Sequence, residues 1–540
     1  MSARRRPPQK TTSAPPARTS ASGRTARPPD RLLVAICVVL ATIAATLVRI
    51  WFPYIWHESG TAASAFYQGD TRPFLAYAAS IVAGQPFDNG IPFHPPGWPF
   101  VLALFYRLMG FNPLAGQPID PGAIKIFVAG ISGLSVGLAT LLAAELAGTG
   151  AMLAVALLGT FHFGHIVEGT TPNSEALYGL LLTAALIVAW GWLRQQGREA
   201  APGWRALARP LLLGALCGFA TLVRAEFELC AVLLLALRWM PGRPRHGRVP
   251  QSAAFVIGMV LLMTPSTVAH WRSLSAFNAA HTTGFPGPMP TFAPVTSYGG
   301  FNFAMANHEN ADGGPNSDHP LLATCTSAES GALAQGQLDL SCPGVYDLFV
   351  HGYGIGAGWL LTHPARAAWL LWRKAVMTSG VFALGYFADD LPVGVNGTRR
   401  RSDLLDPAGR LLWPIHVVLI LLGLGLLWRR ERLAVALLAA PLLTLAASAL
   451  GFYGYVRLGV AYLPAFWVLQ GAALAAIADR LVTSARIRRQ APALVLAAGL
   501  LGLAAQAATA GGSRTLSLDG PRRPDGSLVQ DETVRVVREK

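Results

Sequence analysis

Apolar residues in this chain gather into long runs that short polar segments separate. A helix that crosses a bilayer needs about 20 mostly apolar residues, and the periodicity of the runs is helical rather than alternating. We therefore predict an all-α, polytopic membrane protein with about 11–13 transmembrane helices. The runs lie at 31–51, 97–110, 124–146, 149–167, 174–193, 210–223, 227–240, 251–270, 411–428, 433–450, 458–477 and 491–511.

A further apolar stretch, 356–386, differs from these runs. His363-Pro364 and Arg373-Lys374 interrupt it. Proline breaks the helical hydrogen-bond pattern, and charged residues are costly inside a bilayer. We expect an amphipathic or re-entrant element here rather than a plain span.

The composition supports a membrane protein and excludes soluble, disordered and fibrous classes. Of 540 residues, 52% are hydrophobic and 13% are charged, whereas soluble domains carry about 25% charged residues. The net charge of +15 does not indicate nucleic-acid binding, because residues 1–31 hold eight basic residues against one acidic residue, Asp30. This Pro- and Ser-rich segment cannot bury a core. We expect a basic cytoplasmic tail that contacts anionic lipid.

Basic clusters orient the predicted bundle, since cytoplasmic loops are enriched in Lys and Arg. The segments 52–96 and 271–355 are poor in both residues and should lie outside. Five apolar runs separate Arg31 from Arg194, an odd number between two ends that are both assigned inside, so one run must fail to cross. We expect it to be 124–146 or 149–167. The cytoplasmic clusters lie at 194–209, 238–248, 429–432 and 480–489.

These features divide the chain into five parts. A cytoplasmic tail is expected at 1–30, and a polar tail at 512–540. Between them we expect an N-terminal transmembrane module with a catalytic first external loop (52–96), a large external loop with juxtamembrane helices, and C-terminal transmembrane helices. The last three parts span 31–270, 271–410 and 411–511.

The five cysteines fall into two groups. Cys37, Cys217 and Cys230 lie in apolar runs, where cysteine is a small packed residue. Cys325 and Cys342 lie in the longest polar segment. If that segment faces an oxidising compartment, these two are disulfide candidates.

The first external loop contains the most informative charged residue. Asp70 follows an aromatic segment and precedes an Ala-rich stretch, and the loop ends in His94-Pro95-Pro96 at the start of the next helix. Asp70 is a candidate catalytic carboxylate. Gly-Asp-Thr is also a good helix N-cap sequence, so a purely structural role stays open.

This arrangement resembles the first external loop of GT-C glycosyltransferases, the multi-pass enzymes that include the protein mannosyltransferase and aminoarabinose transferase-like family. Further motifs of the family follow in the same order over residues 30–480. The family often has Asp-Glu where this chain has Asp70-Thr71, and Tyr where it has Phe74, which leaves sugar and acceptor open. The other motifs are Asn173-Ser174-Glu175, the Gly-rich helix ending in Arg224, Gly299–His308, Thr362-His363-Pro364 with Lys374, and Arg457 with Tyr462-Leu463-Pro464.

The resemblance implies transfer of a sugar from a polyprenyl-phosphate donor to a lipid, glycan or protein acceptor on the external face. Such a reaction needs a base for the acceptor proton, and Asp70 is the candidate. It also needs positive charge beside the leaving phosphate, for which Arg224, Arg457 and Lys374 are candidates. The arginines could instead extend their charged ends to the interface. We expect the setting to be a bacterial inner membrane, with loops 52–96 and 271–355 capping the site.

Five polar residues are candidates for binding the acceptor or the donor. Glu58 could be a second acid or a solvated interfacial group. His94 could bind the sugar or pack the loop, and Glu175 could orient the acceptor or begin a helix. The remaining two, Asn302 and Asn307, belong to the Gly- and Asn-rich motif.

No metal site or organic cofactor is indicated. His162, His165 and Glu168 lie close to one helical face, but the histidines lack the i, i+4 spacing of zinc sites and no fourth ligand is evident. We interpret them as polar residues at a helix end.

Two other classes of membrane protein stay open. A polymerase or ligase of lipid-linked polysaccharide would place essential Arg or His residues in the large external loop. A secondary transporter would place charges at the bilayer midplane, often in two similar halves. An essential acid in the first loop favours the transferase.

Overall fold

The computed structural model describes residues 30–56, 70–85, 91–112, 115–117, 120–195, 205–241, 247–281, 286–314, 319–324, 340–382 and 402–481. Over these ranges the chain is helical, without any strand beyond one isolated bridge between Asn112 and Gln117. The helices are α1 (Arg31–Trp56), α2 (Thr71–Ala83), α3 (Gly97–Met109), α4 (Pro121–Ala147), α5 (Thr149–Phe161), α6 (Phe163–Glu168), α7 (Glu175–Gln195), α8 (Arg205–Val223), α9 (Phe227–Ala236), η4 (Leu237–Trp239), α10 (Arg248–Ala280), α11 (Gly299–Met305), η5 (Pro320–Thr324), α13 (Pro343–Thr362), α14 (Pro364–Ser379), η6 (Gly380–Phe382), α15 (Ser402–Arg430), α16 (Arg432–Gly451), α17 (Val456–Val460) and α18 (Leu463–Leu481).

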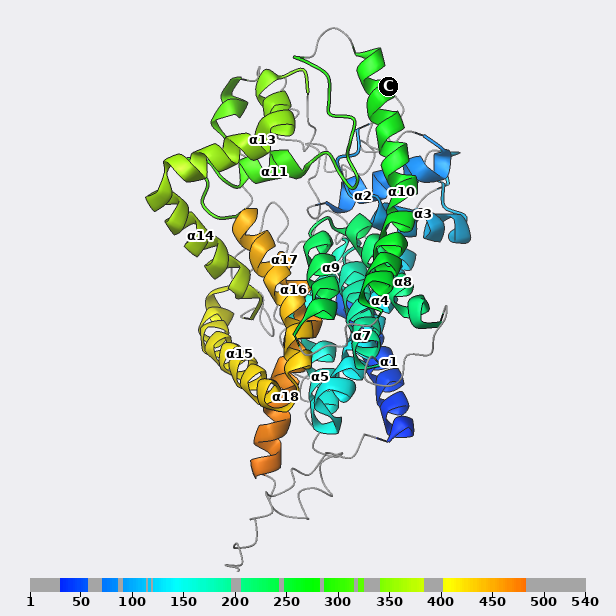
Figure 1. Ribbon diagram of the computed structural model, residues 1–540, viewed down its shortest axis with the longest axis vertical. Coiled ribbons are helices and arrows are strands. Elements are labelled where there is room, and N and C mark those ends of the chain that lie inside the picture. The colour runs from blue at the N-terminus through cyan, green and yellow to red at the C-terminus, as the bar shows by residue number, and fades with distance from the viewer. Residues whose placement is uncertain are drawn as a thin grey trace, which may run out of the picture.

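The long helices form a bundle beneath a layer of shorter elements. Figure 1 shows α1, α4, α5, α7, α8, α15, α16 and α18 in the lower part, with α2, α11 and α13 above them and α10 reaching from one part into the other. Seven described helices are long and apolar enough to cross a membrane, namely α1, α4, α7, α8, α10, α15 and α16. The predicted all-α, polytopic class is confirmed.

The remaining predicted runs are shorter or divided. The run 227–240 is the ten-residue α9 followed by η4, and 458–477 is divided into α17 and α18. The interruption expected within 356–386 is present, because α13 ends at Thr362 and α14 begins at Pro364. The run 491–511 and both tails lie outside the described residues.

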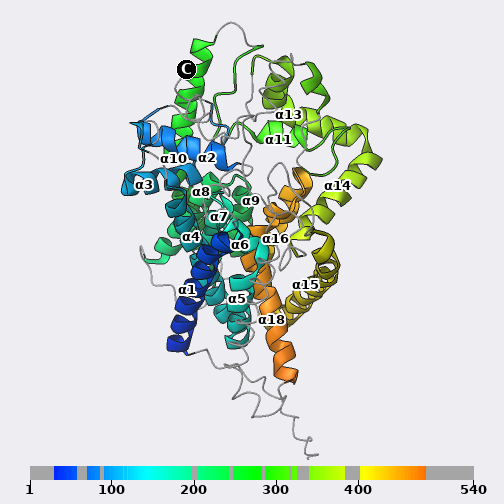
Figure 2. The same ribbon diagram turned by 180° about the vertical axis from the view of Figure 1, so that it is seen from behind.

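The run 124–146 is one of the seven candidate spans, whereas the apolar helix α5 in 149–167 has only 13 residues. The run 97–110 is equally short. This run is α3, whose 13 residues span about 20 Å at 1.5 Å per residue, short of a bilayer core of about 30 Å. Trp98 at its start donates a hydrogen bond to the carbonyl of Pro172, just before α7, at 2.8 Å. Phe105 stacks on Phe127 near the start of α4, with ring centroids 4.3 Å apart. Therefore α3 stays at the end of the bundle where α4 and α7 begin, next to α2 (Figure 2).

The runs 124–146 and 149–167 both traverse the bundle. At the far end, Glu145 of α4 forms a 3.8 Å ion pair with Arg194 of α7. The return path is divided at His162 into α5 and α6. The two helices lead from Gly150, which is packed against Ala475 of α18, back across the bundle to Glu168 at the end of α6.

Glycine allows a very close helix contact in the bundle. A Cβ at Gly214 of α8 would lie 1.9 Å from the carbonyl oxygen of Phe255 on α10, and one at Gly258 of α10 would lie 2.2 Å from that of Leu211. Small residues let backbones approach where lipid leaves no hydrophobic drive between helices.

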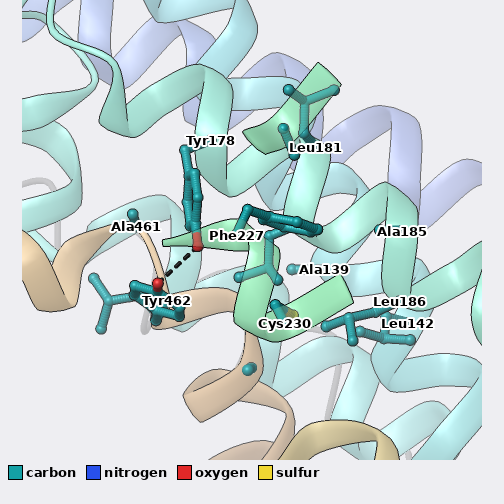
Figure 3. Close-up of a cluster of buried hydrophobic side chains, with 14 of the residues drawn as sticks. Ala139, Leu142, Tyr178, Leu181, Ala185, Leu186, Phe227, Cys230, Ala461 and Tyr462 are labelled. Atoms are coloured by element: carbon teal, nitrogen blue, oxygen red, sulfur yellow. Dashed lines mark hydrogen bonds between the residues drawn. The ribbon is translucent and has the colours of Figure 1, made fainter. Parts of the chain in front are cut away.

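Two buried cores organise the molecule. The larger lies within the bundle, where Tyr178 of α7 and Tyr462 before α18 share a 2.7 Å hydrogen bond between their hydroxyls beside Phe227 and Cys230 (Figure 3). The smaller core lies among the upper elements. It includes Ile91, Met289, Phe301 of α11, and Tyr346 and Phe349 of α13. The candidate site lies where the two meet.

The cysteines divide as the sequence suggested. Cys37, Cys217 and Cys230 carry free thiols, whereas Cys342 is disulfide-bonded and buried in the smaller core. Cys325, the remaining cysteine of the chain, lies outside the described residues.

Candidate functional site

Asp70 lies directly before α2 and points its carboxylate away from that helix. It occupies the N-cap position, yet its side chain makes no capping hydrogen bond. Its Oδ2 instead accepts a 2.8 Å bond from Nη2 of Arg457. The side chain is 49% exposed, so the carboxylate remains open to a substrate. The cap-only interpretation of Asp70 does not describe this contact.

Arg457 is the centre of the site. It lies on α17, a short helix between α16 and α18. Besides Asp70, its guanidinium contacts Glu175, with Nε 2.6 Å from Oε1, and Glu168, with Nε 3.9 Å from Oε2. One side chain therefore joins three segments that are far apart in sequence.

Glu175 links Arg457 to the second arginine. Its Oε1 also accepts a 2.8 Å bond from Nη1 of Arg224, while Oε2 is buried without a partner among the described residues. Arg224 in turn bonds Glu226, with Nε 2.5 Å from Oε1. Because Glu175 is 1% exposed, it can act on a substrate only through the two arginines.

The loop before α7 is tied to the start of α2 by a hydrogen bond. Thr71 donates a 2.8 Å hydrogen bond to Oδ1 of Asn173. Asn173 also lies 3.5 Å from Glu168 through its amide nitrogen. Helix α3 contributes a very close contact, since a Cβ at Gly97 would lie 2.7 Å from the backbone of Leu222 and Val223, which precede Arg224. The site is thus assembled by α2, α3, α6, α7, α8 and α17.

Aromatic side chains flank Asp70 on the side of the smaller core. The His94 ring meets Phe74 edge-on, with centroids 5.4 Å apart, and lies 6.3 Å from the ring of Tyr298. Tyr298 stacks on Phe301 of α11 at 5.1 Å. The 286–298 segment is joined to the first loop, because Ser297 donates a 2.8 Å backbone hydrogen bond to Pro92.

The pKa values of Asp70 and Glu168 are shifted in opposite directions. Partial desolvation by the surrounding protein opposes ionisation of Asp70, but the charge and hydrogen bond of Arg457 outweigh it, so the pKa of Asp70 falls below its ordinary value. For Glu168, burial and the negative charge of Glu175 raise the pKa to about 7, against the opposing charge of Arg457. The site therefore pairs a fixed anion, Asp70, with a carboxyl group that exchanges its proton near neutrality.

Charge in this cluster is unbalanced. Two guanidinium groups, those of Arg224 and Arg457, face four carboxyl groups, those of Asp70, Glu168, Glu175 and Glu226. Protonation of Glu168 reduces the excess negative charge. Such coupling of charge and proton is typical of functional sites.

Other residues singled out in the sequence lie apart from this cluster. Lys374 of α14 is fully buried and bonds Asn307, which is itself buried after α11. Asn302 is partly buried on α11. Glu58 lies outside the described residues.

The two histidines near Glu168 have protein partners. Nδ1 of His165 lies 2.6 Å from a guanidinium nitrogen of Arg49, which is buried on α1, and Nδ1 of His162 accepts from the backbone N–H of His165 at 3.4 Å. Within the described residues, no group of three or more His, Cys, Asp or Glu side chains is arranged to hold a metal ion.

Sequence reasoning missed Glu168 and Glu226 as members of the site. Glu168 ends a six-residue helix and is followed closely by Asn173. Glu226 stands two residues after Arg224. An acid two residues after a basic residue at the end of an apolar run was the signal that could have identified Glu226.

Comparison with known proteins connects this geometry to a fold. No protein-family model matches the chain, and no curated protein sequence does. Among solved structures, the chain is similar to the oligosaccharyltransferase of Archaeoglobus fulgidus tethered to an acceptor peptide that contains the NVT sequon. The TM-score is 0.51 at 12% identity, covering 92% of this chain and 56% of that one. ArnT from Cupriavidus metallidurans, bound to undecaprenyl phosphate, gives a TM-score of 0.33 at 14% identity, covering 82% and 77%.

The chain thus shares the overall fold of this oligosaccharyltransferase. It is a multi-pass membrane protein whose long apolar helices carry a polar cluster at one end of the bundle. It spans just over half the length of the oligosaccharyltransferase that it resembles.

Proposed function

We propose that this protein is a membrane glycosyltransferase that moves a sugar from a polyprenyl-phosphate donor to a lipid, glycan or protein acceptor. The observation that carries the proposal is the half-exposed Asp70 carboxylate, held by Arg457 at the end of the bundle beside aromatic side chains. The GT-C fold and the polyprenyl phosphates named in related solved structures support this class of donor.

The reaction follows from the contacts of Asp70. Its Oδ1 has no hydrogen-bond partner in the described part of the chain and is free to accept the proton of an acceptor hydroxyl. As that proton moves to Asp70, the acceptor oxygen bonds to the anomeric carbon of the donor sugar. The bond from this carbon to the phosphate oxygen breaks, and polyprenyl phosphate leaves with the bonding electrons.

Arg224 and Arg457 are proposed to stabilise the departing phosphate. No contact among the described residues uses Nη2 of Arg224 or Nη1 of Arg457, and the two side chains are 12% and 20% exposed. Because Glu175 already fixes the orientation of both guanidinium groups, their N–H donors require little rearrangement as negative charge develops on the phosphate. Proton uptake by Glu168 would lower the repulsion between the cluster and the phosphate.

Orientation and membrane are part of the same proposal. The cluster lies at the end of the bundle opposite Arg194 and Glu145, and the Arg-rich segments that the sequence assigns to the cytoplasm include Arg194. The active site would then face the exterior of a bacterial inner membrane, with residues 1–30 in the cytoplasm. His94 would contact the sugar or the acceptor.

The experiment compares Asp70→Asn with Asp120→Asn in membranes that contain equal amounts of each protein. Asp120 also stands before a helix, but its side chain caps α4 through Gly122 at 2.8 Å. We expect transfer from a polyprenyl-phosphate sugar to fall by about 10²–10⁴-fold for Asp70→Asn and to persist for Asp120→Asn. Near-normal transfer by a well-folded Asp70→Asn protein would rule out Asp70 as the base. Loss of activity on replacing Arg or His residues of 271–355, with Asp70→Asn active, would favour the ligase.

A further inference from the structure

The buried ammonium group of Lys374 makes unusual contacts for a lysine. The side chain has no exposed surface. Its Nζ donates to Oδ1 of Asn307 at 2.8 Å and to the backbone carbonyl of Leu450 at 3.2 Å. No carboxylate among the described residues pairs with it, and burial lowers the pKa of Lys374 to about 7. Burying such a group is costly, so its contacts have a structural or functional role.

One acceptor of this group, the carbonyl of Leu450, lies at the end of α16. Helices leave their last four carbonyl groups without intrahelical partners. The carbonyl of Leu450 accepts from Lys374, and that of Gly451 accepts from Nδ2 of Asn307 at 2.8 Å. A cation near a helix C-terminus is favourable because the helix dipole is negative there. Lys374 and Asn307 together therefore terminate α16.

The chain that follows α16 is pressed against the same region. The N–H of Gly454 donates to the carbonyl of Gly313 at 2.8 Å. A Cβ at Gly454 would lie 2.2 Å from the carbonyl oxygen of Lys374, so the segment passes directly over the α14 backbone. Three residues further on, Arg457 begins its contacts with Asp70 and Glu175.

We propose that Lys374 and Asn307 form a buried clamp that fixes the segment 450–457 and thereby places the Arg457 guanidinium against Asp70. Lys374 is then a positioning residue rather than a phosphate ligand. The catalytic part of this inference rests on the proposed function, whereas the clamp itself is a property of the fold.

Hydrogen–deuterium exchange tests the clamp without any need for activity. In purified full-length protein, Lys374→Met should accelerate exchange of the 452–460 amides by about tenfold or more, because local opening becomes easier. Arg373→Met changes the exposed neighbouring residue and should leave this exchange unchanged. If Lys374→Met fails to fold, Asn307→Asp retains the acceptor for Lys374 but removes the donor to Gly451, and the same acceleration is expected. Unchanged exchange in a folded variant would overturn the proposal.

A double-mutant cycle tests the link to Arg457. We expect Lys374→Met to lower kcat about tenfold or more in the wild-type background, since small displacements of a charged group are costly. In an Arg457→Gln background the same change should have little further effect. An equal loss in both backgrounds would show that Lys374 acts independently of Arg457 and overturn its positioning role. Full activity of Arg457→Gln, with faster exchange in Lys374→Met, would refute the proposed catalytic role of Arg457 and leave the clamp intact.

Discussion

Nη2 of Arg457 lies 2.8 Å from Oδ2 of Asp70, although 387 positions separate the two residues. The contact joins the segment before α2 to the short helix α17. The same guanidinium also bonds the buried Glu175, so its plane is fixed from two sides. Asp70 is thereby kept ionised while its other oxygen stays accessible.

Replacing Arg457 should show whether the reaction needs only its positive charge or also the geometry of its guanidinium group. A lysine keeps the charge but has one ammonium group, which cannot reproduce the fork that contacts Asp70 and Glu175 together. We expect Arg457→Lys and Arg457→Gln both to reduce kcat/KM by about 100-fold or more. Arg107→Gln, at an exposed site on α3, serves as the control. Near-normal rates for Arg457→Lys would show that charge alone suffices.

The pH dependence of donor binding should report Glu168. Its raised pKa of about 7 means that Glu168 is mostly protonated below neutral pH and becomes negative above it. Donor KM should therefore rise above about pH 7, because a phosphodiester donor keeps its charge while the site becomes more negative. Initial rates across about pH 5.5–8.5, roughly 1.5 units on each side of that pKa, measure this. Glu168→Gln should remove the rise, and a rise of equal size in that variant would assign it to another group.

Folding stability should depend on Glu168 and Asp70 with opposite signs. For Glu168 the raised pKa means that the folded protein binds the proton more tightly, so its contribution is present below about pH 4.3 and is lost as pH rises to about 7. The lowered pKa of Asp70 gives a contribution that is lost as pH falls through its folded value. Denaturation of the wild-type protein and of Glu168→Gln at several pH values measures these contributions. The contribution of Glu168 should be present in the wild-type protein and absent in Glu168→Gln.

Gly97 should be intolerant of a side chain. Because a Cβ there meets the α8 backbone at 2.7 Å, Gly97→Ala must move α3 away from Leu222 and Val223. We expect a loss of about 1–3 kcal/mol in stability and lower activity, since Arg224 follows directly. Gly130→Ala on α4, where a Cβ meets nothing within 4 Å, should preserve both. Thermal unfolding in detergent compares the two, and equal midpoints would contradict the close contact.

The tyrosine pair beneath the site should show coupling. Tyr178→Phe leaves the buried hydroxyl of Tyr462 without its 2.7 Å partner, which costs about 1–3 kcal/mol. In the double variant Tyr178→Phe/Tyr462→Phe no hydroxyl is left unsatisfied. Its destabilisation should therefore be smaller than the sum of the single effects, and additive losses would argue against the bond.

The sequence by itself determined the helical, membrane-embedded class and the break between α13 and α14. These follow from local features, namely runs of apolar residues and a His-Pro pair that ends a helix. It also singled out Asp70 as a charged residue beside an apolar run, and the resemblance of its ordered motifs to a known family singled out Glu175, Arg224 and Arg457.

Only the tertiary structure decided how those residues combine. Whether Asp70 caps α2 or binds Arg457 depends on where α17 packs. Burial of Lys374 and the raised pKa of Glu168 likewise arise from neighbours far away in sequence. Hydrophobic pattern and helix breaking act over a few residues, whereas burial and charge pairing are fixed by the packing of distant helices.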